Sequence, residues 1–134
     1  MSADSIIDSQ ALRALFKHEC SQRLQAFSLA LAATVQTMDD PDVWDKLHQE
    51  LDSLANGART VNDAETELLG RRLATMARMA RDHAALRNPA LDILFRAVTA
   101  IQCHCLEKEG DACLLSAHSY ENLLKKVDRL EFKP

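Results

Sequence analysis

The sequence predicts an all-α protein, an up-and-down antiparallel bundle of five helices, from three observations. Alanine and leucine dominate a chain of 134 residues that has only 3 Gly and 3 Pro, which leaves little material for hairpin turns. Apolar residues recur every three or four positions, as on the buried face of a helix. The breaks between these stripes are short, and short loops join antiparallel helices. We expect residues 1–134 to form one domain with its own core.

The first helix is expected to be the longest, over residues 6–37. Its steps of three or four residues define a stripe of Leu12, Phe16, Cys20, Leu24, Phe27, Leu31, Val35 and Met38. Asp40 and Pro41 then supply an N-cap and a favoured first position for a second helix. That helix is expected to end at residues 56–58, in a small-residue turn around Gly57.

Three more helices are expected after the second. The third runs from a capping segment at residues 62–65 to about residue 87, and Asn88-Pro89 begins the fourth. Gly110-Asp111 separates the fourth from the fifth. The apolar stripes of these helices are Leu69, Leu73, Met76 and Ala80, then Leu91, Leu94, Val98, Ile101 and Cys105, then Ala117, Tyr120, Leu124, Val127 and Leu130.

The net charge of the chain bears on whether it binds nucleic acid or a membrane. With 16 basic and 20 acidic residues the net charge is −4, and no basic cluster stands out in the sequence. We therefore expect neither nucleic acid nor an anionic membrane surface as a partner. The chain shows no charged-then-apolar leader and no apolar run of spanning length, so we expect a cytoplasmic protein.

No metal or other cofactor is expected. The segment Cys103-His104-Cys105 resembles a ligand cluster, but residues two apart on a helix point about 200° apart and cannot chelate one ion. In the expected helix Cys105 is a core position and His104 faces outward. The four cysteines are expected to be buried thiols: Cys20, Cys103, Cys105 and Cys113.

One carboxylate on the second helix needs a functional explanation. The apolar stripe of this helix consists of Leu47, Leu51, Leu54, Ala58 and Val61. Asp52 lies about 130° from the middle of that stripe, so it points outward from the middle of the helix. His48 lies one turn before Asp52 and Asn56 one turn after it.

The stretch from Glu50 to Val61 resembles the signature of histidine-containing phosphotransfer (HPt) domains. It is also similar to the N-terminal phosphotransfer domain of the bacterial chemotaxis histidine kinase. The family pattern reads approximately His-Ser-Leu-Lys-Gly-Gly-Ala-Arg-Thr-Phe-Gly, with Val61 here in place of the aromatic residue. The direct matches are Ser53, Leu54, Gly57, Ala58, Arg59 and Thr60. The resemblance covers most of the chain, since the expected helices and the Asp-Pro break fit the chemotaxis-kinase type.

The departures from the family pattern fall on its phosphotransfer site. The family's phosphorylated His corresponds to Asp52, its Lys to Ala55, and its first Gly to Asn56. Phosphotransfer requires an exposed imidazole nitrogen, and the Lys provides positive charge for the phosphoryl oxygens. Ala55 supplies no such cation, so the resemblance implies that Asp52 is not phosphorylated and that the chain is not an enzyme.

The resemblance therefore implies a non-catalytic, pseudo-phosphotransfer domain of bacterial two-component signalling. It is expected to dock a response-regulator receiver domain or a histidine kinase through the second helix and an adjacent helix. The residues expected on the docking face are Asp45, His48, Gln49, Asp52, Ala55, Asn56 and Arg59.

Two alternatives remain open at this point. In the first, His48 is the phosphoacceptor of an active phosphotransfer protein, with Asp52 accepting a hydrogen bond from it but repelling the phosphoryl group. In the second, the helices serve mainly as a dimerisation or assembly module, and the chain is a homodimer. Arginines of the third helix form a solvated face or the rim of an interaction surface: Arg71, Arg72, Arg78 and Arg81.

Overall fold

The computed structural model describes residues 2–105 and 111–131, which are all-helical apart from short connections and contain no strand. The predicted all-α class with five helices is confirmed for these residues. The helices are α1 (Ser2–Gln36), α2 (Pro41–Thr60), α3 (Ala64–Asp82), α4 (Arg87–Cys105) and α5 (Asp111–Glu131), with a 3₁₀ turn η1 (Ala84–Leu86) before α4. In the described residues, none of these helices combines the length and the apolar character needed to cross a membrane.

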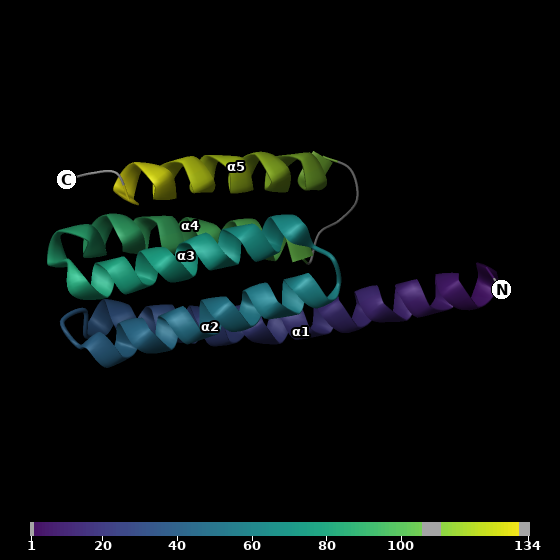
Figure 1. Ribbon diagram of the computed structural model, residues 1–134, viewed down its shortest axis with the longest axis horizontal. Coiled ribbons are helices and arrows are strands. Elements are labelled where there is room, and N and C mark those ends of the chain that lie inside the picture. Colours follow the sequence, from purple (N-terminus) through teal and green to yellow (C-terminus); the bar gives the residue numbers. More distant parts are fainter. Residues whose placement is uncertain (1, 106–110, 132–134) are drawn as a thin grey trace.

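The helices lie side by side, and successive helices run in alternating directions (Figure 1). α2 packs between α1 and α3, and α4 contacts α1, α3 and α5. α5 also contacts α3, and it lies on the side of α3 and α4 that faces away from α1 and α2 (Figure 1). The first half of α1 extends beyond the ends of the other helices (Figure 1). This arrangement leaves one flank of α2 and α3 open to solvent.

The core is built from the predicted apolar stripes. On α2 the central stripe positions, Leu47, Leu51 and Leu54, are buried, whereas the stripe positions Val98 of α4 and Leu124 of α5 are only partly buried. The side chains of the stripe residues Leu12, Phe16 and Ala117 lie outside the described part. One prediction in α1 is wrong: Val35 is 42% exposed, and its neighbour Thr34 is fully buried instead. The buried side chains of the other helices include Cys20, Leu24, Phe27, Leu31, Leu69, Leu73, Met76, Leu94, Ile101, Tyr120, Leu123 and Val127.

The buried threonine has a local explanation. The Thr34 hydroxyl donates to the carbonyl of Ala30 at 2.8 Å, which satisfies it inside α1. Its oxygen also lies 3.4 Å from the carbonyl of Val43 on α2. The indole nitrogen of Trp44 donates to the carbonyl of Met38 at 2.8 Å. These bonds fix the α1–α2 connection, where a polar side chain substitutes for the expected valine.

Three predicted helix boundaries are wrong. α1 begins at Ser2 rather than at residue 6. α2 continues through Gly57 to Thr60, and the chain turns only at Asn62, which has a φ of 63°. A glycine inside a helix costs only about 1 kcal/mol, which the packing of the surrounding leucines offsets.

The third error concerns the end of α3, which stops at Asp82 rather than near residue 87. Arg87 is the first residue of α4, and its guanidinium donates to the carbonyls of Ala80 and Arg81 at 2.9 and 2.8 Å. A cation on the last carbonyls of a helix satisfies them and favours termination there. Asp63 caps the start of α3 by accepting a hydrogen bond from the backbone N–H of Thr66, which confirms the predicted capping segment.

Candidate functional site

The predicted docking residues of α2 face a row of arginines on α3. We call this surface the α2–α3 face; its residues are Asp45, His48, Asp52 and Asn56 on α2 and Arg71, Arg78 and Arg81 on α3. The α2 residues are three or four positions apart and the arginines seven and three apart, so each set follows one edge of its helix. Because α2 and α3 pack along their lengths, the two edges meet and form ion pairs.

Asp52 lies at the centre of the α2–α3 face and its side chain is 39% exposed. One carboxylate oxygen, Oδ1, accepts from Nη1 of Arg71 at 3.3 Å. The other, Oδ2, lies 3.1 Å from Nε2 of His48. The cation that Ala55 does not supply therefore comes from the neighbouring helix, and the expected contact between His48 and Asp52 is confirmed.

Arg71 joins Asp52 to the end of the predicted motif. Its Nη2 donates to the side-chain oxygen of Asn56 at 2.7 Å. The same nitrogen lies 3.6 Å from Oε2 of Glu67, one turn earlier on α3. Asp52 and Asn56 are thus held by one guanidinium.

Both ring nitrogens of His48 are engaged. Nδ1 donates to the backbone carbonyl of Ala74 at 2.9 Å, because a carbonyl can only accept. Nε2 lies 3.1 Å from Asp52 and 3.3 Å from Nη2 of Arg78. When Nε2 carries a proton it donates to Asp52, and when it carries none it accepts from Arg78. The His48 side chain is only 19% exposed, so neither nitrogen is presented freely to a phosphoryl donor.

Asp45 marks the other end of the face. Its Oδ1 accepts from Nη1 of Arg81 at 2.6 Å. Arg81 also donates to Asp82, and this hydrogen bond lowers the pKa of the Asp82 carboxyl below its usual value. Three of the arginines that were predicted to form a solvated face therefore contact α2. Arg71 and Arg81 form ion pairs with it, and Arg78 bonds to His48. The partner of Arg72 is instead Asp128 on α5.

Ala55 was predicted to lie on the exposed side of α2, and this prediction was wrong. Its side chain is fully buried between α2 and α3. A Cβ placed on Gly70 of α3 would lie 3.1 Å from the Cβ of Ala55, so the two helices approach closely at this point. Ala55 is close to Asp52 in the sequence motif. On the helix, however, the side chain of Ala55 points toward α3. Gln49 and Arg59 are exposed on α2, as predicted.

A second polar cluster, which was not predicted from the sequence, lies at the start of α3. Nε2 of His104 lies 2.9 Å from Oδ2 of Asp63, and Thr66 links Asp63 to the hydroxyl of Tyr120. The ring of His104 lies 5.0 Å from that of Tyr120. His104 is thus partly buried rather than facing outward. Tyr120 lies on the predicted stripe of the fifth helix, but no pattern in the sequence placed His104 beside it.

The cysteine prediction fails for two residues that the structure describes. Cys103 is exposed, and Cys20 is buried but disulfide-bonded rather than a free thiol. The side chains of Cys105 and Cys113 lie outside the described part. Among the described residues, His, Cys, Asp and Glu side chains form no group of three or more that could hold a metal ion.

The chain was compared with protein-family models, curated proteins and solved structures, and none of them matches it. The interpretation of the α2–α3 face therefore depends on its own geometry and on the sequence signature.

Proposed function

We propose that this protein is a non-catalytic, HPt-like binding module of bacterial two-component signalling. In this proposal its helices form an up-and-down bundle of the HPt type, and the α2–α3 face docks a receiver domain or a histidine kinase. The observation that carries the proposal is the position of Asp52. It occupies the phospho-histidine position of the signature and lies half-exposed at the centre of the face, held by Arg71 and His48.

The surface around Asp52 has the composition of a protein-docking face. Charged side chains of both signs meet along the seam between α2 and α3, and such patterns orient a partner and select it by complementary charge. Leu68, which is 51% exposed, lies one turn before Arg71 and Arg72 on α3 and offers an apolar contact beside the ion pairs. Protein–protein interfaces usually have an apolar core and a polar rim.

The same geometry argues against phosphotransfer through His48. A phosphoryl group must approach a free ring nitrogen, but Nδ1 is bonded to the carbonyl of Ala74 and Nε2 lies between Asp52 and Arg78. The carboxylate also repels an incoming phosphoryl group. We therefore assign docking rather than catalysis to this surface.

Docking is tested by charge reversal at the centre of the face. Receiver domains and histidine kinases of the encoding organism are purified and titrated with the wild-type chain and with Asp52→Arg. The variant places a second cation beside Arg71, and we expect the affinity for the true partner to fall at least about tenfold. The matched control is Glu19→Arg, the same charge change on exposed α1, and its affinity should equal that of the wild type. Equal binding by all three chains would refute the docking face.

Catalysis is tested separately with a phosphorylated receiver or an active kinase. We expect no acid-labile, base-stable phosphate on the chain. Label that appears on the wild type and disappears in His48→Ala would instead establish His48 as a phosphoacceptor. A stable dimer that buries α2, detected by light scattering and by loss of dimerisation in Asp52→Arg, would support the assembly-module alternative.

A further inference from the structure

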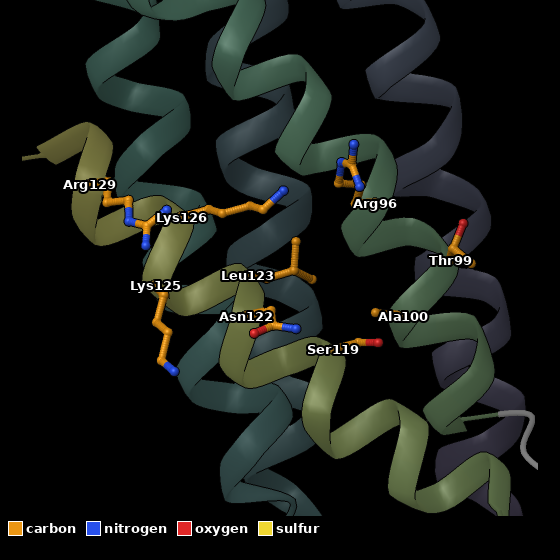
Figure 2. A pocket seen from close by; sticks show the side chains of 9 residues that line it. All are labelled: Arg96, Thr99, Ala100, Ser119, Asn122, Leu123, Lys125, Lys126 and Arg129. Atoms are coloured by element: carbon orange, nitrogen blue, oxygen red, sulfur yellow. The ribbon is translucent and has the colours of Figure 1, made fainter.

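A hollow of about 470 Å³ lies between α4 and α5, on helices that take no part in the α2–α3 face (Figure 2). Its inner wall is apolar and includes the buried side chains Ala100 and Leu123. Its other walls are basic or hydrogen-bonding: Arg96, Thr99, Ser119, Asn122, Lys125, Lys126 and Arg129. A second hollow, of about 250 Å³ between α1 and α4, has no charged residue in its lining.

The lining of the α4–α5 hollow concentrates positive charge. It contains four basic residues and no carboxylate, although the whole chain carries a net charge of −4. These residues form no cluster in the sequence, because one of the four, Arg96, lies on a different helix from the other three. Figure 2 shows Lys126 extending from α5 toward Arg96 on α4, whereas Lys125 points away from the hollow.

Nearby carboxylates neutralise this charge only in part. Arg96 pairs with Asp92 at 3.2 Å and Lys125 lies 3.7 Å from Glu121, and all four side chains are largely exposed. Exposed pairs of this kind contribute little and are readily exchanged for another anion. Lys126 and Arg129 have no ion-pair partner in the part of the chain that the structure describes. Neighbouring cations repel one another, so an anion that enters the hollow is favoured.

The shape and chemistry of the hollow favour a small phosphorylated ligand. Its volume falls within the range of small-molecule sites, and such sites combine apolar walls with a few polar groups. Arginine and lysine bind phosphate oxygens by charge-assisted hydrogen bonds. The hydroxyls of Thr99 and Ser119 and the amide of Asn122 can bond a sugar, while Leu123 offers an apolar surface to a base. A long nucleic acid requires a basic stripe, whereas these residues surround one hollow.

We infer that the α4–α5 hollow binds a small phosphorylated anion of the nucleotide class, with Arg96 and Lys126 holding the phosphates from opposite helices. This inference is independent of the proposed docking function, because the two sites share no residue. The ligand phosphates replace Asp92 as the partner of Arg96. A ligand that bridges the helices also stabilises the contact between α4 and α5.

Calorimetric titration with ATP, pyrophosphate and adenosine tests the inference. We expect ATP to bind most tightly, pyrophosphate more weakly, and adenosine not measurably. The double variant Arg96→Gln, Lys126→Gln should weaken ATP binding at least about tenfold, since it removes two charge-assisted contacts. ATP should also raise the melting temperature of the wild type but not that of the variant.

The matched control is Arg23→Gln, Lys46→Gln, which removes two exposed basic residues outside the hollow. It should bind ATP as the wild type does. Equal weakening in both double variants would show a general charge effect and overturn the inference. So would the absence of ATP binding at millimolar concentration, or tighter binding of an acidic peptide such as polyglutamate than of ATP.

Discussion

Arg71 of α3 lies 3.3 Å from Asp52 of α2, where its guanidinium provides the positive charge that the sequence signature lacks at Ala55. The pair joins the two helices at the centre of the α2–α3 face. It gives that face a fixed arrangement of charges, with Asn56 on the same guanidinium and His48 on the other carboxylate oxygen. An outward carboxylate on α2 is thus part of a cross-helix network and not an isolated surface charge.

We expect this ion pair to contribute little to stability. Asp52 and Arg71 are each nearly 40% exposed, and exposed pairs contribute about 0.2–1 kcal/mol. Asp52→Asn and Arg71→Gln should therefore each lower the free energy of unfolding by less than about 1 kcal/mol. A double-mutant cycle in urea should give a coupling energy of about 0.5 kcal/mol that decreases in high salt. A coupling energy that is large and independent of salt would contradict this expectation.

Introducing the family's lysine at Ala55 should damage the fold. The side chain of Ala55 is fully buried and faces Gly70, so a lysine has no room and its ammonium loses water. We expect Ala55→Lys to lower the free energy of unfolding by about 3 kcal/mol or more, measured by urea denaturation. Gln49→Lys, on exposed α2, is the matched control and should have little effect. Equal stability of the two variants would show that Ala55 is not in the α2–α3 contact.

The burial of Ala55 also affects a variant that carries three residues of the HPt signature. Changing Asp52, Ala55 and Asn56 together to the family residues would introduce the destabilising lysine along with the histidine. We therefore expect Asp52→His with Asn56→Gly to fold better than the triple variant. Comparing their melting temperatures by circular dichroism separates the loss of fold from the loss of transfer.

Two helical glycines should respond in opposite ways to alanine. A Cβ on Gly57 meets nothing within 4 Å, whereas one on Gly70 lies 3.1 Å from the Cβ of Ala55 and 3.3 Å from the backbone oxygen of Leu51. Gly57→Ala should raise the free energy of unfolding by about 0.5–1 kcal/mol, the ordinary gain of alanine over glycine in a helix. Gly70→Ala should lower it by about 1 kcal/mol, because α2 must move outward. A gain at both positions would mean that the α2–α3 contact relaxes without cost.

Asp63 should make stability depend on acid pH. Burial alone raises the pKa of its carboxyl, but hydrogen bonds from His104 and Thr66 outweigh burial and hold the pKa below its usual value of 3.8. A carboxylate with a lowered folded pKa stabilises the protein fully above its unfolded pKa, and this contribution disappears as the pH falls through the folded pKa.

The variant Asp63→Asn retains a capping side chain but does not titrate. We expect wild type to be more stable than this variant at about pH 5, and the difference to shrink toward about pH 3. Urea denaturation at several pH values measures both curves. Parallel curves across this range would show that the folded and unfolded pKa values of Asp63 are the same.

The apolar stripes predicted much of the fold because helical periodicity is a local property of the sequence. Leu47, Leu51 and Leu54 are buried as their spacing indicates. Helix ends were predicted less well, because they depend on contacts with other elements as well as on local residue types such as Gly57. α2 continues beyond Gly57 because its leucines pack against the neighbouring helices. α3 ends at Asp82, where the side chain of Arg87, which belongs to α4, bonds to the last carbonyls of α3.

The sequence by itself determined the helical class, the main core positions and the outward direction of Asp52, since all three follow from residue type and a repeat of about 3.6 residues. Tertiary structure alone decided that Arg71 faces Asp52, that Ala55 is buried against Gly70, and that Arg96 and Lys126 share one hollow. These relationships depend on the register and rotation of one helix against another. That register is set by the packing of whole helix faces, which a single stretch of sequence does not specify.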